Sequence, residues 1–314
     1  MIISASRRTD IPCFYSQWFM KRLREGFVCV PNPFNAHQVA RVSLAQQDVD
    51  VVVFWSKNPA PMVPHLDEIS KRGLPFFFHF TLNAYPKEFE PRIPDFETIT
   101  QTFIDLSRML GKQRVIWRYD PIILSNVTDF SFHSQNFDRI LERIGPHTTR
   151  LVTSFFDEYR GAKRNFIRLG QKNIFLQELD VQDAGYETLV RHMVKRAGEF
   201  GLEIFSCAEP PEMRLPELGI PAGKCIDDQY ILREFGIQVD STPDRFQREA
   251  CGCVKSKDIG MYDTCQNQCV YCYAISQDSR VNANQKQHNV DSPSLLGYYD
   301  CPEGKSFPAQ LPMF

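Results

Sequence analysis

The feature that most constrains the fold is a regular alternation of apolar, β-rich runs with amphipathic helical runs over the first two hundred residues. Most of the apolar runs are nearly continuous, which is typical of parallel strands covered on both faces. The helical runs each end at a glycine, a usual stop for a helix. This alternation predicts a (β/α) barrel or partial barrel. The expected strands are residues 2–6, 49–55, 75–81, 114–119, 150–156 and 202–207, and the expected helices are residues 15–26, 64–73, 96–111 and 185–201.

Polar residues gather where the expected strands end. Ser56 and Lys57 follow one strand, Thr81 and Asn83 follow another, and Arg118 closes a third. The carboxyl ends of parallel strands form the mouth of a barrel, where binding residues collect. Some of these residues are expected to be ordinary loop polars or helix caps. Lys57 and Arg118 each close a strongly apolar run and are the stronger candidates for a site.

The alternation stops near residue 208, which divides the chain into three segments. Residues 1–207 are expected to carry the barrel strands and helices. Residues 208–257 form a Pro- and Gly-rich connecting segment that contains cysteines and one helical run at 226–236. Residues 258–314 are expected to complete the barrel with a strand at 258–263, a helix and a polar, loop-like tail from residue 283 onward.

Cysteine usage and charge narrow the function classes. The chain has ten cysteines in 314 residues, no 18-residue apolar stretch and no signal peptide at its start. We therefore expect a cytoplasmic protein without membrane contact, in which cysteines are metal ligands or reactive thiols more often than disulfides. The formal net charge of -2 gives no overall basic field for nucleic acid. Only a local patch of Arg7, Arg8 and Arg118 leaves phosphate binding open.

The motif that carries chemistry runs from Cys265 to Cys272 and reads C-Q-N-Q-C-V-Y-C. Its spacing is C-x3-C-x2-C. Three thiolates from one short loop can hold three irons of a [4Fe–4S] cubane, and the fourth iron is then left without a protein ligand. A cofactor or substrate can bind that open iron. Cys265, Cys269 and Cys272 are therefore the candidate cluster ligands.

The stretch YDTCQNQCVYCYA (262–274) resembles the cluster loop of the radical S-adenosylmethionine (SAM) superfamily, and especially that of the spore photoproduct lyase-like branch. In the superfamily this loop normally follows the first barrel strand, whereas here it lies near the C-terminus. Segments 4–12, 54–59, 81–94 and 118–123 resemble later strand ends of that branch, in the same order. The resemblance implies a partial (β/α)6-type radical SAM barrel that is circularly permuted, with a cysteine-rich irregular insert. Residues 258–280 would then supply the first strand and its helix, beside strand 2–6.

The same resemblance implies an activity. SAM would chelate the open iron, the reduced cluster would cleave it, and a 5′-deoxyadenosyl radical would abstract hydrogen from a substrate in the barrel mouth. An electron donor such as flavodoxin or ferredoxin is implied, and the substrate is left open. Lys57 and Arg118 are the expected catalytic residues. The residues that match SAM-contacting positions are Ser56 and Lys57 for the carboxylate, Tyr271 for adenine, Thr81 and Asn83 for the ribose, and Arg118 for SAM or an anionic substrate.

Four further cysteines lie outside this loop: Cys207, Cys225, Cys251 and Cys253. Four thiolates suit an auxiliary [4Fe–4S] cluster or a structural zinc ion, and unligated thiols are the third alternative. The remaining three cysteines are expected to be bystanders, two of them as small buried hydrophobes. These three are Cys13, Cys29 and Cys301, of which the first two are expected to be buried.

Other functions remain open at this point. A non-catalytic iron–sulfur or zinc protein on a degenerate barrel would be distinguished by a fourth protein ligand to the cluster of the C-x3-C-x2-C loop. A zinc knuckle would use two of these cysteines with others. A hydrolase barrel using His79 or Asp120 is disfavoured, because none of the histidines lies in a metal motif such as H-E-x-x-H.

Overall fold

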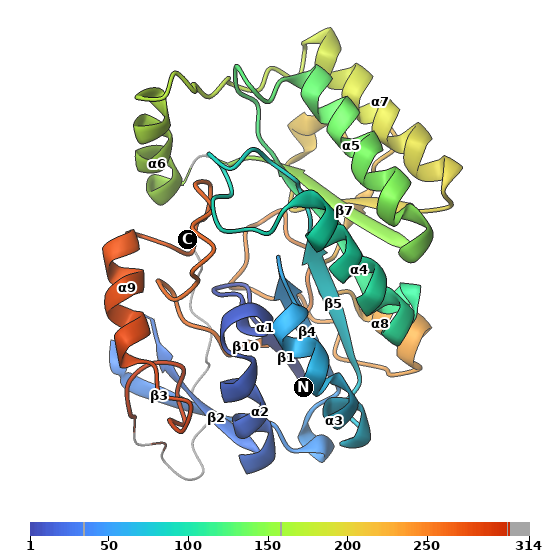
Figure 1. Ribbon diagram of the computed structural model, residues 1–314. Helices are drawn as coiled ribbons and strands as arrows, with labels where there is room; N and C mark the ends of the chain where they lie inside the picture. The colour runs from blue at the N-terminus through green and yellow to red at the C-terminus, as the bar shows by residue number, and fades with distance from the viewer. Residues whose placement is uncertain (34, 158, 300, 302–314) are drawn as a thin grey trace.

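An all-parallel sheet of eight strands dominates the computed structural model, which describes residues 1–33, 35–157, 159–299 and 301. The sheet order is β10-β1-β4-β5-β6-β7-β8-β9, and it curls into a half-barrel (Figure 1). Within the described residues the two edge strands, β10 and β9, do not pair with each other. The strands are β1 (Ile2–Ala5), β4 (Val51–Ser56), β5 (Phe76–Thr81), β6 (Val115–Ile122), β7 (Arg150–Phe155), β8 (Glu203–Cys207), β9 (Ala222–Gly223) and β10 (Lys257–Asp258).

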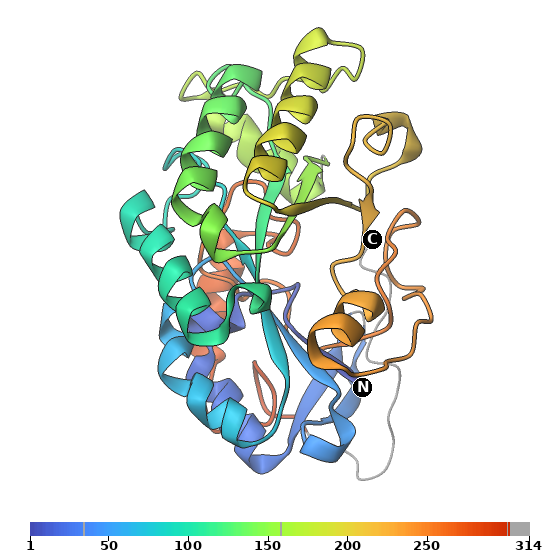
Figure 2. The same ribbon diagram turned by 90° about the vertical axis from the view of Figure 1, so that its right-hand side faces the viewer.

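Helices cover both faces of this sheet. The larger group packs on one face, and α8 (Asp228–Phe235) lies on the opposite side (Figure 2). Helices α6 (Arg160–Gly170) and α9 (Asp278–Gln287) lie apart from both groups (Figure 1). The larger group consists of α1 (Ile11–Phe14), α2 (Ser16–Glu25), α3 (Leu66–Lys71), α4 (Phe96–Leu110), α5 (Phe130–Ile144) and α7 (Ala184–Glu199).

The apolar strands divide their side chains between two cores. Ile3, Val52 and Phe78 belong to the main core beneath the larger group of helices. Val53 and Phe77, one position away, belong to the second core beneath α8. Successive side chains of a strand point to opposite faces, so a sheet that is covered twice needs apolar residues at nearly every position. The nearly continuous apolar runs of the sequence therefore correctly predicted parallel strands, and the α/β partial-barrel fold class is confirmed.

Each strand predicted within residues 1–207 is present, and its bounds differ from the prediction by three residues at most. The predicted helices are also present as α2, α3, α4, α7 and α8. Asp95, Asp183 and Asp227 cap three of them, because each side chain accepts a hydrogen bond from a backbone N–H in the first turn. These caps fix where the helices begin and so hold the loops that lead out of the sheet.

The strand expected at 258–263 is shorter than predicted. β10 covers only Lys257–Asp258, but it lies beside β1 and runs parallel to it, as predicted, with Ile3 opposite Lys257 and Ser4 opposite Asp258. The Asp258 carboxylate accepts hydrogen bonds from Ser4 Oγ, Ser6 Oγ and the backbone N–H groups of Arg7 and Gly260. The chain then leaves the sheet, because these bonds turn it at Gly260 toward the cysteine loop.

Several elements are absent from the sequence predictions. The antiparallel strands β2 (Phe27–Asn32) and β3 (Asn35–Ser43) form a separate two-stranded sheet. Helices α5 and α6 were also unpredicted, and α9 continues to Gln287, into the part that was expected to be a loop. Short 3-10 helices cover Gln46–Asp48, Ala60–His65, Lys112–Arg114, Gly145–His147 and Pro211–Met213.

Candidate functional site at the carboxyl end of the sheet

A cavity of about 270 Å³ opens at the carboxyl ends of strands β1, β4, β5, β6, β7 and β8. This is the edge where parallel α/β proteins place their binding residues. Both predicted sets of cysteines reach it, one from each side. The sequence-predicted residues that line it are Ser56, Lys57, Thr81, Arg118, Cys207, Cys225, Cys251, Cys253, Cys265, Cys269, Tyr271 and Cys272.

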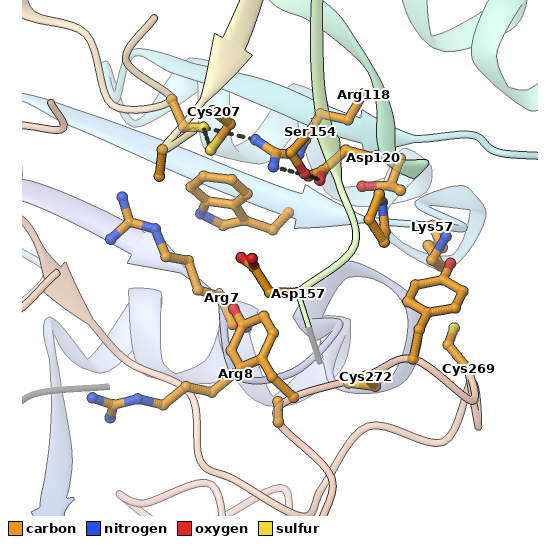
Figure 3. Close-up of a pocket in the computed structure, with 18 of the residues that line it drawn as sticks. Arg7, Arg8, Lys57, Arg118, Asp120, Ser154, Asp157, Cys207, Cys269 and Cys272 are labelled. Carbon is orange, nitrogen blue, oxygen red and sulfur yellow. Dashed lines mark hydrogen bonds and ion pairs between the residues drawn. The ribbon is translucent and has the colours of Figure 1, made fainter. Parts of the chain in front are cut away.

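The three thiols of the C-x3-C-x2-C loop all line this cavity, and Figure 3 shows Cys269 and Cys272 together on one side of it. Burial raises the pKa of both Cys265 and Cys272 to about 12, with further contributions from the charges of Asp10 and Cys269 respectively. Burial also raises the pKa of Cys269, although the positive charge of Lys57 opposes this. Ligation to metal must displace the protons of these thiols.

Nearby backbone N–H groups lower the pKa of two of these thiols. They belong to Asn267 and Asp10 beside Cys265, and to Ala274 and Ile275 beside Cys272. Hydrogen bonds to sulfur stabilise its anionic form, so these donors favour thiolates in contact with a metal cluster. The loop therefore suits an anionic iron–sulfur cluster, because its three thiols line the cavity and backbone N–H groups lie near two of the sulfurs.

Asp10 connects the cysteine loop to the sheet, although it was not among the predicted cofactor-binding or metal-ligating residues. Its buried carboxylate accepts hydrogen bonds from Ser56 Oγ at 2.7 Å and from the Lys57 backbone N–H at 2.8 Å. It also accepts from Asn267 Nδ2 of the cysteine loop and from the Cys13 backbone N–H, which it caps at the start of α1. A signal was present in the sequence, since Asp10 belongs to the T-D-x-x-P pattern at 9–12.

Lys57 lies beside the cysteine loop but already has a protein partner. Its Nζ is 2.7 Å from Glu90 Oε1, and both side chains are nearly buried. Tyr271 donates its hydroxyl hydrogen bond to the same Glu90 oxygen, and Lys57 Nζ lies 5.4 Å from the Tyr271 ring centroid. Glu90, missed as a site residue, therefore holds both. The E-P-R sequence at 90–92 was the signal that could have identified it.

Thr81 and Asn83 are placed differently from each other. Thr81 ends β5 and lines the main cavity. Asn83 lines a smaller neighbouring pocket instead. Its amide donates to the Asp120 carbonyl at 3.0 Å and to the Tyr271 hydroxyl at 3.2 Å, and it accepts from the Asp120 backbone N–H. Asn83 thus positions Tyr271 and the end of β6 rather than facing the cavity.

The four outlying cysteines come together on the other side of the cavity, next to Arg118 (Figure 3). The sulfurs of Cys207 and Cys225 lie 3.0 Å apart. Cys225 and Cys253 lie close enough for each to shift the pKa of the other, and the same holds for Cys253 and Cys251. Arg118 Nη1 donates to the Cys225 sulfur at 2.8 Å, while its Nη2 pairs with Asp120.

Arg7 is a second cation at these thiols, and it was predicted only as part of a phosphate-binding patch. Its two terminal nitrogens are buried and have no hydrogen-bond partner in the described structure. Burial opposes its charge, but attraction to Cys253, Cys251 and Cys225 outweighs burial and raises the pKa of Arg7. The guanidinium carbons of Arg7 and Arg118 lie 5.0 and 5.2 Å from the ring centroid of Trp55, so both cations contact this indole.

The remaining cysteines do not reach the cavity. Cys13 is a free thiol whose pKa is raised by burial and by the charges of Asp10 and Cys265. It is half-buried rather than fully buried. Cys29 is buried, as expected, but it forms a disulfide with Cys301. Both residues lie away from the cavity, as expected of bystanders, but they pair with each other, because the chain after α9 returns to strand β2 and brings Cys301 to Cys29.

No group of three or more His, Cys, Asp or Glu residues in the described ranges has an arrangement that could hold a single metal ion as it stands. The ligands of a cubane each bind a different iron, so they do not need to converge on one point. None of the described helices is long and apolar enough to span a membrane.

Comparison with known proteins gives one match. No curated protein and no solved structure matches the chain. A family model matches residues 2–274, which begin at β1, contain all eight strands of the parallel sheet and end just beyond Cys272. The matched stretch thus includes the cavity and both sets of cysteines. The chain belongs to the family described as DUF1848, a domain of unknown function.

Proposed function

We propose that this protein is a radical SAM enzyme whose catalytic [4Fe–4S] cluster is held by Cys265, Cys269 and Cys272. The observation that carries the proposal is the placement of these three thiols, which all line the main cavity at the carboxyl end of the parallel sheet. A loop that only stabilised the fold would have no need to present three sulfurs to a cavity. The proposal also accounts for the parallel pairing of β10 with β1, which sets the loop at the same edge as the other strand ends.

The proposal requires one iron without a protein ligand. Cys13 is close enough to Cys265 for the charge of that residue to raise the pKa of Cys13, but Cys13 does not line the cavity. The carboxylate of Asp10 is occupied by four hydrogen bonds, so it is a weak competitor for iron. The side of the cluster that faces the cavity is therefore available to SAM, whose amino and carboxylate groups can chelate iron.

When bound to these cysteines and reduced, a [4Fe–4S] cluster would supply one electron to the SAM sulfonium, and cleavage of its S–C5′ bond would give methionine and a 5′-deoxyadenosyl radical. The residues of the chain orient SAM and exclude water. We assign the Lys57 ammonium group to the SAM carboxylate. Lys57 would then pair with this carboxylate as well as with Glu90. Tyr271 and Thr81 line the same cavity and are assigned to the adenosine part, and Ser56 to the carboxylate end. A low-potential donor such as flavodoxin or ferredoxin would reduce the cluster.

SAM cleavage tests the proposal directly. The full chain is purified without oxygen, reconstituted with iron and sulfide, reduced with dithionite and incubated with SAM. We expect methionine and 5′-deoxyadenosine to form, and the combined variant C265S/C269S/C272S to form neither. The matched control C13S, which changes a cysteine outside the cavity, should retain the activity. A reconstituted cluster that cleaves no SAM would reject the proposal and favour a non-catalytic iron–sulfur carrier.

A further inference from the structure

Cys207, Cys225, Cys251 and Cys253 converge from three parts of the fold. Cys207 ends strand β8, Cys225 lies between β9 and α8, and the other two lie in the loop that leads to β10. The sulfurs of Cys207 and Cys225 lie 3.0 Å apart, and Cys251 and Cys253 line the same cavity, close enough to this pair for Cys253 to shift the pKa of Cys225. A structural role in packing does not require four thiols at one place, whereas a metal centre with four thiolates does.

The charges around these thiols point to an anionic occupant. Arg118 already donates one hydrogen bond to the Cys225 sulfur. Arg7 has two buried terminal nitrogens without a partner, and it lies close enough to interact with Cys225, Cys251 and Cys253. A buried guanidinium with unpaired N–H groups is costly. The cost disappears if the sulfurs that it faces are thiolates that can accept hydrogen bonds.

We propose that Cys207, Cys225, Cys251 and Cys253 form a second, fully ligated metal centre, whose negative charge is balanced by Arg7 and Arg118. A [4Fe–4S] cluster or a zinc ion with four thiolates carries a net charge of about −2. A cubane suits the described arrangement directly, because its ligands bind different irons, whereas zinc would require these thiols to move toward one point. Binding replaces the four S–H bonds with S–metal bonds and releases the protons, without oxidising sulfur. Release of these protons also removes the S–H···S hydrogen bond between Cys207 and Cys225.

This centre differs in kind from the one proposed for the C-x3-C-x2-C loop. With four cysteine ligands it has no open position, so it would not chelate SAM. Because it lines the same cavity, its occupancy would fix the ends of β8 and of the connecting segment at the cavity wall. The inference does not depend on the proposed radical chemistry, since it rests on residues outside that loop.

Metal content of two complementary variants tests the inference. The full chain and its variants are purified without oxygen, supplied with iron, sulfide and zinc, desalted and analysed for all three elements. In C265S/C269S/C272S we expect one zinc ion, or four irons with sulfide, to remain. In C251S/C253S that complement should be lost while the iron of the other loop remains. Zinc identifies a single ion, and iron with sulfide identifies a cluster.

The outcomes separate the two proposals. If C265S/C269S/C272S holds no more metal than a variant with all seven of these cysteines replaced, the second centre does not exist. A disulfide between Cys207 and Cys225, found by mass spectrometry in the anaerobic protein, would also overturn it. If C251S/C253S instead lacks iron, it is the cluster proposed for catalysis that fails.

The role of Arg7 has its own readout, which is the rate and extent of metal loss to a chelator from C265S/C269S/C272S. Adding Arg7→Gln should weaken metal retention about tenfold, since it removes a charged hydrogen-bond donor. Adding Arg7→Lys, which keeps the charge, should restore part of it. Circular dichroism of the metal-free forms separates this effect from misfolding. Equal retention in all three proteins would remove Arg7 from the centre.

Discussion

Lys57, which follows one strand of the sheet, is held in place by residues from loops that follow other strands. Lys57 follows β4, whereas its partner Glu90 comes from the loop after β5 and Tyr271 from the cysteine loop. The exposed fractions of the two charged side chains are 13% and 3%, so the ion pair is largely shielded from water. A buried pair is weak evidence for stability by itself, but removing one member leaves an uncompensated charge.

We predict that Glu90→Gln lowers the free energy of unfolding of the metal-free protein by about 3 kcal/mol, because the buried ammonium of Lys57 loses its counter-ion. The double variant K57M/E90Q should recover most of that loss, since neither charge remains. Urea unfolding of wild type, both single variants and the double variant provides the measurement. If the losses of the two single variants simply add in the double variant, the pair is not coupled and the prediction is wrong.

The residues that a pattern can identify are those with a fixed spacing. The C-x3-C-x2-C loop and the strand-end positions of Ser56, Lys57, Thr81 and Arg118 follow from order along the chain, and the structure places all of them at one cavity. The contacts of Glu90 and Arg7 could not be predicted in the same way. They depend on how far neighbouring strands extend and on which loop folds over the edge, and no local pattern encodes that.

Among the secondary-structure elements, the strands were predicted best, because burial on both faces gives each a nearly continuous apolar run. The hairpin β2–β3 lies outside the parallel sheet and lacks that signature. Helix α5 did carry a helical signature, with the cap Asp129 followed by buried apolar residues such as Phe137 and Leu141. The apolar residues of the expected strand 258–263 could not predict that β10 is so short. The chain turns away where the Asp258 carboxylate accepts its hydrogen bonds.

The junction of β10 with β1 provides a test at this scale. A Cβ added at Gly260 would lie 2.0 Å from Ser6 Oγ and 2.6 Å from Ser6 Cβ. Ser6 cannot easily move, because its hydroxyl donates to Asp258 and accepts from the Arg8 backbone N–H. We therefore expect Gly260→Ala to destabilise the protein by about 2 kcal/mol in urea unfolding.

Gly198 supplies the matched control for that substitution. It lies in helix α7, and a Cβ there would meet no atom within 4 Å. Gly198→Ala should stabilise the protein by about 0.5–1 kcal/mol, through helix propensity alone. If Gly260→Ala is no less stable than Gly198→Ala, the contact between the end of β10 and the end of β1 is not as close as described.

At the scale of the whole molecule, the segment that carries the cysteine loop is part of the main core. That core includes Ile3 from the first strand, but also Ile259 and Leu295 from the last part of the chain. Two buried aromatic residues of the N-terminal region depend on the same segment. Tyr15 donates its hydroxyl hydrogen bond to the Thr264 carbonyl, and Trp18 donates from Nε1 to the Ser292 carbonyl. The carboxyl-terminal segment therefore completes the fold rather than extending from it.

Truncation tests this integration. A chain that ends at residue 255 loses β10 and the partners of Tyr15 and Trp18. Its β1 would become an exposed edge strand, which favours aggregation. We expect weaker far-ultraviolet circular dichroism and no cooperative unfolding transition. The full-length variant C265S/C269S/C272S is the control, because it should lose the iron of its loop and still unfold cooperatively. A truncated chain that folds and unfolds like this control would mean that residues 256–314 form a separate module. The cysteine loop would then not belong to the barrel, and an electron carrier would explain it better than a radical enzyme.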